Sequence, residues 1–158
     1  MKYLDFHKVA EYLISKSVPG TEWAMTHLKL QKLMYYVQSF HLALADDKLF
    51  IGRIEAWVHG PVCPDLYREY SNYGAGEISP STCIDFSEFD NNQKVIIDSV
   101  WKAYGHLSGA HLETLTHRED PWNEARKKAG VSYWQACNEE ITDESMKKYY
   151  KRFLKRKS

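Results

Sequence analysis

The sequence predicts a mainly α-helical fold: a single compact helical domain of six or seven helices, spanning residues 1–158. Apolar side chains recur at intervals of three and four residues in several segments, which is the pattern of helices with one buried face. β-prone residues gather near residues 48–58, where we expect a small β-hairpin or short antiparallel sheet. A length of 158 residues is typical of one domain with a substantial core.

The first two helices follow from periodicity and from turn residues. Asp5–Lys16 carries one apolar face, and Pro19-Gly20 marks the turn that ends it. Thr26 suits the N-cap of a long second helix over His27–Ala45. Because so many large side chains share one face, we expect this to be the central helix of the domain. Its stripe contains Leu30, Leu33, Met34, Val37, Phe40 and Leu44, widened by Tyr36 and His41.

The β element is predicted from two short runs, Lys48–Ile51 and Arg53–Val58, on either side of Gly52. We expect a hairpin or two edge strands, followed by a turn at His59-Gly60-Pro61. A helix over Pro64–Tyr73 comes next, since proline suits the first helical position. Glu55 in the second run is a candidate for a half-buried salt bridge to Lys29 or Lys32 of the central helix.

The second half of the chain predicts four further helices after an irregular stretch. Tyr73–Ser87 contains glycine, serine and proline, and Ile78 and Ile84 suggest a brief strand. A helix over Asn91–Gly105 follows, with Trp101 on its apolar face. Three residues are expected to be N-caps of the last three helices: Ser108, Asp120 (which precedes Pro121) and Thr142.

Composition and charge exclude several classes of protein. No apolar run reaches the ~20 residues of a membrane helix, and the acidic N-terminal segment does not match a signal peptide. The three cysteines lack CxxC spacing, so we expect reduced thiols in a cytoplasmic protein. Seven of the 21 basic residues lie in Lys147–Ser158 without an acid, which leaves 14 basic against 21 acidic residues elsewhere. We interpret this basic end as a solvated helix end. The alternative is a contact for an acidic protein surface or for nucleic acid, and a pI near 7.0 disfavours nucleic acid.

No complete catalytic, cofactor or metal motif is present. The seven histidines show no metal-ligand spacing, the serines no GxSxG elbow, and the glycines no phosphate-binding loop. We therefore predict a protein that is not an enzyme and that needs no cofactor or metal. The alternative is a small hydrolase or thiol enzyme using His59, Cys63 and His117, because Cys63 precedes a predicted helix start, where a thiol pKa is often lowered.

Three blocks carry a resemblance to a known family. They are KLQKLMYYVQSFHLA at Lys29–Ala43, IEAWVHGPVCPDLYREY at Ile54–Tyr70 and LTHREDPWNEAR at Leu115–Arg126. In this order they resemble the Panacea domain, the SocA-like antitoxin domain also found in phage-associated GepA-type proteins. The resemblance implies a mainly helical fold with a small β element and an antitoxin that neutralises a toxin protein by binding it. In one branch the antitoxin is a proteolytic adaptor that delivers the toxin to a Clp-type protease.

The aromatic motif residues suit a core and a partner interface equally well, and both interpretations stay open. We expect Trp57 to be mainly structural and Trp122 to be partly exposed. The candidate partner-binding residues are His59, Gly60, Pro61, Tyr67, Tyr70, His117, Pro121 and Trp122. The candidate structural residues are Leu30, Leu33, Tyr36, Glu55, Trp57 and Trp101.

Overall fold

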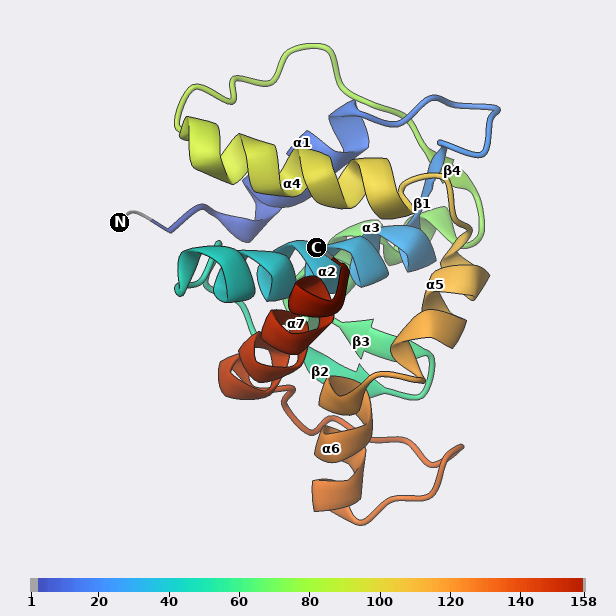
Figure 1. The fold of residues 1–158 in the computed structure, drawn as a ribbon. Coiled ribbons are helices and arrows are strands. Elements are labelled where there is room, and N and C mark those ends of the chain that lie inside the picture. The colour runs from blue at the N-terminus through green and yellow to red at the C-terminus, as the bar shows by residue number, and fades with distance from the viewer. Residues whose placement is uncertain (1–2, 158) are drawn as a thin grey trace.

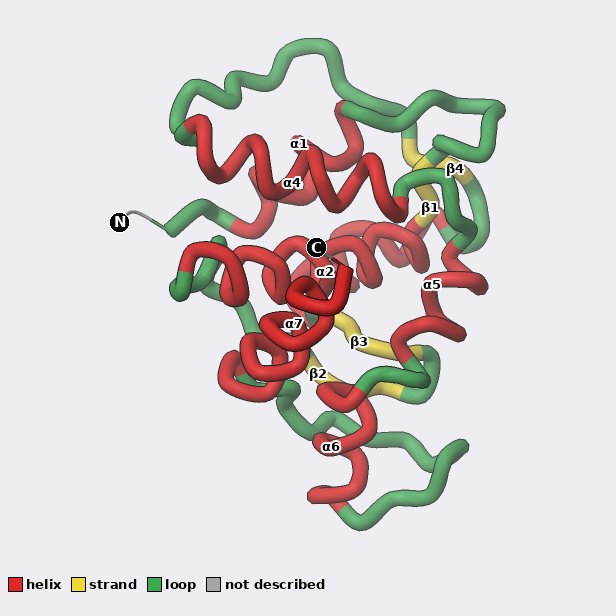
Figure 2. Tube along the Cα trace, in the orientation of Figure 1, coloured by secondary structure: helices red, strands yellow, loops and turns green. Residues whose placement is uncertain are grey.

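The computed structural model describes residues 3–157, which form a mainly α-helical fold with two small antiparallel sheets (Figures 1 and 2). This confirms the predicted fold class. The elements in chain order are α1 (Phe6–Ser15), β1 (Met25–Thr26), α2 (His27–Ala45), β2 (Glu55–Trp57), β3 (Gly60–Val62), α3 (Pro64–Tyr70), the 3₁₀ turn η1 (Ser71–Tyr73), β4 (Glu77–Ile78), α4 (Asn91–Tyr104), α5 (Gly109–Thr116), α6 (Asp120–Ala129) and α7 (Asp143–Lys157).

Helix α2 is the centre of the fold, as its apolar pattern predicts. Nearly all of its residues are buried, including polar ones, because other helices pack around it: α1, α4, α5 and α7. Figure 1 shows α1 and α4 on one side of α2, α7 crossing it, and the β2–β3 hairpin on the other side. A helix surrounded in this way positions the segments on both sides of it.

The helix starts follow their predicted caps with one correction. The Thr26 hydroxyl accepts a hydrogen bond from the backbone of Lys29, and the Ser108 hydroxyl accepts one from the backbone of His111. Asp120, expected to be an N-cap, is instead the first residue of α6, and Glu119 occupies the cap position without a side-chain cap bond. The Glu119 carboxylate is bonded elsewhere, to buried tyrosines described below.

The β element lies later in the chain than the sequence suggests. Strand β2 pairs with β3, with Trp57 opposite Gly60. The turn is therefore Val58-His59, and the prediction of a turn at His59-Gly60-Pro61 is wrong because Gly60 and Pro61 belong to β3. Ile84 forms no strand, whereas Ile78 pairs with Met25 in the second sheet.

Lys48–Ile51 does not form the expected strand. Its backbone N–H and C=O groups are instead hydrogen-bonded by the side chain of Gln38 in α2. The Gln38 amide donates to the Phe50 carbonyl at 2.8 Å and its oxygen accepts from the Leu49 N–H at 2.9 Å. The Leu49 carbonyl accepts from the Leu4 N–H. One buried glutamine thus replaces the partner strand, which satisfies backbone groups that are otherwise costly to bury.

Trp122 lies in the core, which corrects the expectation that it is partly exposed. Its side chain is 1% exposed, and its indole N–H donates to the Trp57 carbonyl at 2.8 Å. Trp57 itself is only partly buried, so its ring is the more accessible of the two. The indole of Trp122 therefore anchors α6 to the β2–β3 hairpin.

We expect Trp122→Ala to lower the free energy of unfolding by about 3–5 kcal/mol, because it removes a fully buried ring and leaves a cavity. Trp134, which is 71% exposed, is the matched control, and Trp134→Ala should change stability by less than about 0.5 kcal/mol. Urea unfolding of both variants measures the difference. Equal losses would show that Trp122 is not a core residue.

Candidate functional site

Two of the three sequence blocks meet at the buried carboxylate of Glu119, where α7 joins them. Tyr35 and Tyr36 of α2 donate their hydroxyl hydrogen bonds to its two oxygens, both at 2.9 Å. Tyr150 of α7 donates to the first of these oxygens at 2.6 Å. Glu119 is 7% exposed, so three hydroxyls replace the water that its charge has lost. The carboxylate joins the central helix, the start of α6 and the last helix.

Burial governs the protonation of this cluster. Loss of water raises the pKa of Glu119, while the three tyrosine hydrogen bonds act in the opposite direction. The pKa values of Tyr35, Tyr36 and Tyr150 are all raised, first by burial and then by the neighbouring charge. The three hydroxyls therefore stay protonated and act as hydrogen-bond donors to Glu119. This gives the cluster a structural role.

A second junction joins α2 to the hairpin through Lys32. Its ammonium group donates to the Pro61 carbonyl at 3.0 Å, and the side chain is fully buried. Gly60 has φ +101°, and a Cβ placed there would lie 2.7 Å from the Lys32 Cε. Glycine at position 60 is thus required both by its backbone conformation and by the close passage of the lysine chain.

Beside this junction lies a pocket of about 740 Å³. One wall is the N-terminal half of α2, and the others are the hairpin, α3, α5 and the segment before α7. Such a volume is typical of sites that hold small molecules. The lining residues are His27, Leu28, Gln31, Lys32, Trp57, Val58, His59, Val62, Tyr67, Glu113, Ala136, Cys137 and Asn138.

Buried polar atoms in this pocket lack protein partners. Both ring nitrogens of His27 and the amide nitrogen of Gln31 have no hydrogen bond within residues 3–157. The Gln31 oxygen is occupied, since it accepts from the Cys63 N–H at 2.9 Å. Buried polar groups normally find a partner, so these atoms are among the exceptions in the described part of the chain.

Burial also weakens the charge of Lys32. Loss of water lowers its pKa from 10.5 to about 7, opposed by the negative charge of Glu113. No ion pair with a carboxylate is recorded for Lys32 in the described part of the chain. Lys29, one turn earlier, has its pKa lowered to about 8 for the same reason, and it donates to the carbonyls of Glu22 and Ala24.

The expected salt bridge from Glu55 to Lys29 or Lys32 is therefore wrong. Glu55 instead accepts from Arg53 at 2.6 Å and from the indole of Trp57 at 2.8 Å. Both lysines instead bond backbone carbonyls: Lys32 that of Pro61, and Lys29 those of Glu22 and Ala24.

The residues of the thiol-enzyme alternative are engaged separately. Cys63 is 1% exposed, and burial raises the pKa of its thiol, which disfavours the reactive thiolate. The His59 ring contacts Glu113 at 3.1 Å, and the His117 ring contacts the Tyr133 hydroxyl at 2.7 Å. No nucleophile–base contact joins these three side chains among the recorded hydrogen bonds.

Most of the candidate partner-binding residues are less accessible than expected. Gly60, Pro61, Pro121 and Trp122 are buried, and Tyr70 and His117 are partly buried. His59 and Tyr67 are exposed, and both line the pocket. The motif residues thus mostly build the scaffold of the site, while two of them reach its surface.

Two exposed aromatic residues in the segment between α6 and α7 were not anticipated from the sequence. Tyr133 and Trp134 are 49% and 71% exposed, and their rings lie 4.7 Å apart. They precede the pocket-lining residues of the segment between α6 and α7. The available signal was a Tyr-Trp pair in a stretch without helical periodicity.

Arg126 holds this segment in place. Its guanidinium group donates to the carbonyls of Ser132, Tyr133 and Gln135 and to that of Ala56 in the hairpin. The side chain is 4% exposed and lies over the Trp122 ring at 4.9 Å. The exposed Tyr133-Trp134 pair is therefore presented by an ordered segment.

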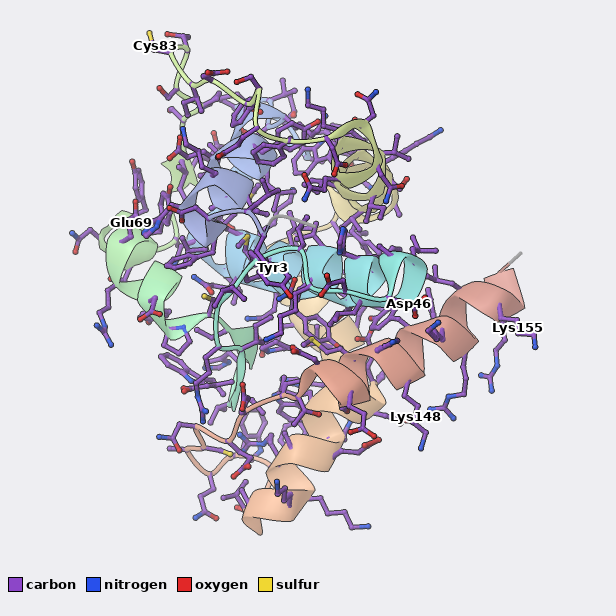
Figure 3. The ribbon with its side chains drawn as sticks, turned by 90° about the vertical axis from the view of Figure 1, so that its left-hand side faces the viewer. Tyr3, Asp46, Glu69, Cys83, Lys148 and Lys155 are labelled. Carbon is purple, nitrogen blue, oxygen red and sulfur yellow. The ribbon has the colours of Figure 1, made fainter. Side chains whose placement is uncertain are left out.

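The basic end of the chain forms part of α7 and is partly neutralised within the molecule. Lys147 and Lys151 contact Asp46 at the end of α2, and Arg152 contacts Asp120. The two lysines lower the pKa of Asp46. Figure 3 shows Asp46 beside α7, with Lys148 and Lys155 pointing outward from the helix.

No group of three or more His, Cys, Asp or Glu side chains is arranged to hold a metal ion within residues 3–157. Over the same range, no helix combines the length and the apolar character needed to cross a bilayer.

Comparison with known proteins decides the family. The model of the family described as "Antitoxin SocA-like, Panacea domain" matches residues 30–123, more than half of the chain. The chain belongs to the SocA-like Panacea family. It is also similar to Antitoxin SocA of Caulobacter vibrioides (strain NA1000 / CB15N), with 28% identity over 131 residues, covering 76% of this chain and 69% of the relative. No solved structure matches.

The Panacea match covers the two junctions described above. It includes Tyr35 and Tyr36 with Glu119, and Lys32 with Pro61. It ends at residue 123, before the exposed Tyr133-Trp134 pair. The resemblance stated from the three sequence blocks is confirmed, and the blocks prove to contact one another in space.

The lowered pKa of Lys32 predicts how stability changes with pH. Between its folded value of about 7 and its ordinary value of 10.5, the unfolded chain binds more protons, so stability rises with pH. We expect Lys32→Met to remove about 2 kcal/mol of the rise between about pH 7 and pH 9.

Urea unfolding at the two pH values measures this slope. Lys29 contributes to the same rise, so the comparison is between the unsubstituted protein and each variant, with the exposed Lys148→Met as the control. If the unfolding free energy changes with pH to the same extent in Lys32→Met and in the control, the pKa of Lys32 is not lowered by burial.

Proposed function

We propose that this chain is the antitoxin of a toxin–antitoxin pair and that it neutralises its partner by direct protein–protein binding, without catalysis. Membership of the SocA-like Panacea family is the observation that carries the proposal. The similarity to a protein named Antitoxin SocA supports it. The protonated thiol of Cys63 and the separate engagement of His59 and His117 favour binding over catalysis.

The surface that best suits a protein partner surrounds the pocket mouth. It contains the exposed rings of Tyr67, Tyr133 and Trp134, with the imidazole of His59 nearby in the pocket lining. Aromatic side chains at this density are typical of binding hot spots. Because Arg126 fixes the backbone that carries two of these rings, less conformational entropy is lost on binding.

Two modes of neutralisation share this surface. The bound antitoxin either covers the active surface of the toxin or delivers it to a Clp-type protease. Both modes require the same contacts, so substitutions at the surface affect them alike. The half-life of the toxin in cells with and without the protease separates them, because only delivery shortens it. Either mode places the protein in the cytoplasm.

Co-expression tests the proposal. We expect the chain to restore growth when it is produced with the toxic product of a neighbouring gene, and to bind that product in a pull-down. Trp134→Ala should weaken this binding by about 2 kcal/mol while its melting temperature is unchanged, since the ring is 71% exposed.

Val95→Ala is the matched control for this substitution. Val95 is 60% exposed on α4, which lies at the opposite end of the molecule from the segment between α6 and α7 (Figures 1 and 3). Its removal should leave affinity unchanged. The antitoxin proposal fails if no neighbouring product is toxic and none binds the chain.

We expect no specific retention of nucleic acid by the basic end of α7. Lys147, Lys151 and Arg152 already contact carboxylates, and the whole chain has a net charge of zero. Fluorescence anisotropy with a labelled DNA duplex at near-physiological salt measures this. Tight binding that falls steeply with salt, and that is lost in a Lys155→Gln, Arg156→Gln, Lys157→Gln variant, would support nucleic-acid binding instead.

A further inference from the structure

We propose that the pocket between α2, the β2–β3 hairpin and the segment at residues 136–138 binds a small organic carboxylate with an apolar or aromatic body. The carboxylate would accept hydrogen bonds from Lys32, Gln31 and His27, and the body would lie against Trp57 and Tyr67. This inference does not depend on the antitoxin function, because it concerns a ligand of the isolated chain.

The polar floor of the pocket supplies hydrogen-bond donors. The Gln31 amide nitrogen is a donor without a partner, and its oxygen is held by Cys63. Lys32 uses one bond to the Pro61 carbonyl, although an ammonium group has three hydrogens to donate. One ring nitrogen of neutral His27 is a donor, and neither nitrogen is bonded. A ligand rich in acceptor oxygens satisfies this set.

The electrostatics favour a negative group at this floor. Lys32 is fully buried without an ion-pair partner among residues 3–157, and an anion beside it offsets the lost hydration. His27 and Leu28 are the first two residues of α2, so the positive end of a 19-residue helix borders the pocket. No acidic residue occupies the first turn of that helix.

Three other titratable groups influence Lys32. Glu113 lines the pocket and attracts its charge, while His27 and His117 repel it when protonated. The Glu113 carboxylate contacts the exposed His59 ring at 3.1 Å, with 21% of its own side chain exposed. It therefore lies towards the mouth. A bound carboxylate at the floor would be attracted by Lys32 and repelled more weakly by Glu113.

The walls suit an apolar or aromatic body. The Tyr67 ring lies 5.0 Å from the Trp57 ring and 4.6 Å from the His27 ring, measured between centroids. Leu28, Val58 and Val62 complete the apolar lining. The unbonded groups lie at the floor, on residues that are no more than 8% exposed, so a compact ligand reaches them more readily than a folded protein surface does.

Isothermal titration of the purified full chain with three matched probes tests the proposal. Hydrocinnamate carries the carboxylate, hydrocinnamamide replaces it with a neutral amide, and phenethylammonium replaces it with a cation. We expect hydrocinnamate to bind about tenfold or more tightly than the amide, because a hydrogen bond to a charged group is stronger than a neutral one. The cation should not bind measurably.

Substitutions locate the site. Lys32→Met should weaken hydrocinnamate binding about tenfold or more. His27→Phe keeps the ring shape and removes only unbonded nitrogens, so it should weaken binding while the fold is retained. Glu113→Gln should strengthen binding, because it removes the one carboxylate in the pocket lining. Opposite effects of Lys32 and Glu113 cannot arise from general loss of folding.

A proton-linkage readout adds an independent check. Repeating the titration near pH 7.5 in buffers of different ionisation enthalpy should show proton uptake on binding, since a bound carboxylate favours the charged form of Lys32. The uptake should be smaller in Lys32→Met.

Three outcomes with the small probes would overturn the proposal. They are no binding of any probe, equal binding of the amide and the carboxylate, and carboxylate binding that all three substitutions leave unchanged. Binding of a peptide from the partner protein, with none of the small probe, would assign the pocket to a protein segment and also overturn it. The results with the small probes do not bear on rescue from a toxin, so the two proposals fail separately.

Discussion

The carboxylate of Glu119 is the constraint on which the rest of the structure depends. It is buried where α2, the start of α6 and α7 meet, and it accepts three tyrosine hydroxyls. A buried carboxylate is tolerated only when such donors replace water, so the three elements are positioned relative to one another by a shared polar centre. Trp122, three residues later, then fixes α6 to the hairpin through the Trp57 carbonyl. The position of the hairpin sets the wall of the pocket.

Polar side chains of α2 organise the segments beside it in a consistent way. Gln38 occupies the backbone groups of Leu49 and Phe50, Gln31 accepts from Cys63, and Lys32 donates to Pro61. Each side chain satisfies a backbone group that lacks a strand partner. The segments are therefore held by the helix rather than by a larger sheet. After this bonding the amide nitrogen of Gln31 has no hydrogen-bond partner within the described residues.

The helices could be predicted from the sequence because their signals are local. Periodicity and the Thr26 cap define α2 at His27–Ala45, in agreement with the structure. Local propensity predicts a hairpin that begins too early in the chain. It does not reveal the hydrogen bonds between the Gln38 side chain and the backbone of Leu49 and Phe50, which prevent a strand there. Partial exposure is predicted for Trp122 because it follows Pro121, whereas its burial depends on packing against the distant hairpin. Glu119 gave no signal, since a carboxylate bonded by three tyrosines resembles any surface acid in sequence.

The candidate site has an interior part, which lies within the residues that the family model matches, and an exposed part, which lies beyond them. Lys32, Pro61, Tyr35, Tyr36 and Glu119 all lie within the residues that the Panacea model matches, and they bond one another in the interior. Tyr133 and Trp134 lie beyond that match and are exposed, yet the buried Arg126 holds their backbone. Substitution of the exposed pair changes the surface without disturbing the tyrosine–Glu119 cluster. The contacts of Glu119 and Lys32 that join the elements of the interior do not include the side chain of Trp134, whereas the Tyr133 hydroxyl contacts the His117 ring. Variation at Trp134 therefore changes the surface while these interior contacts remain.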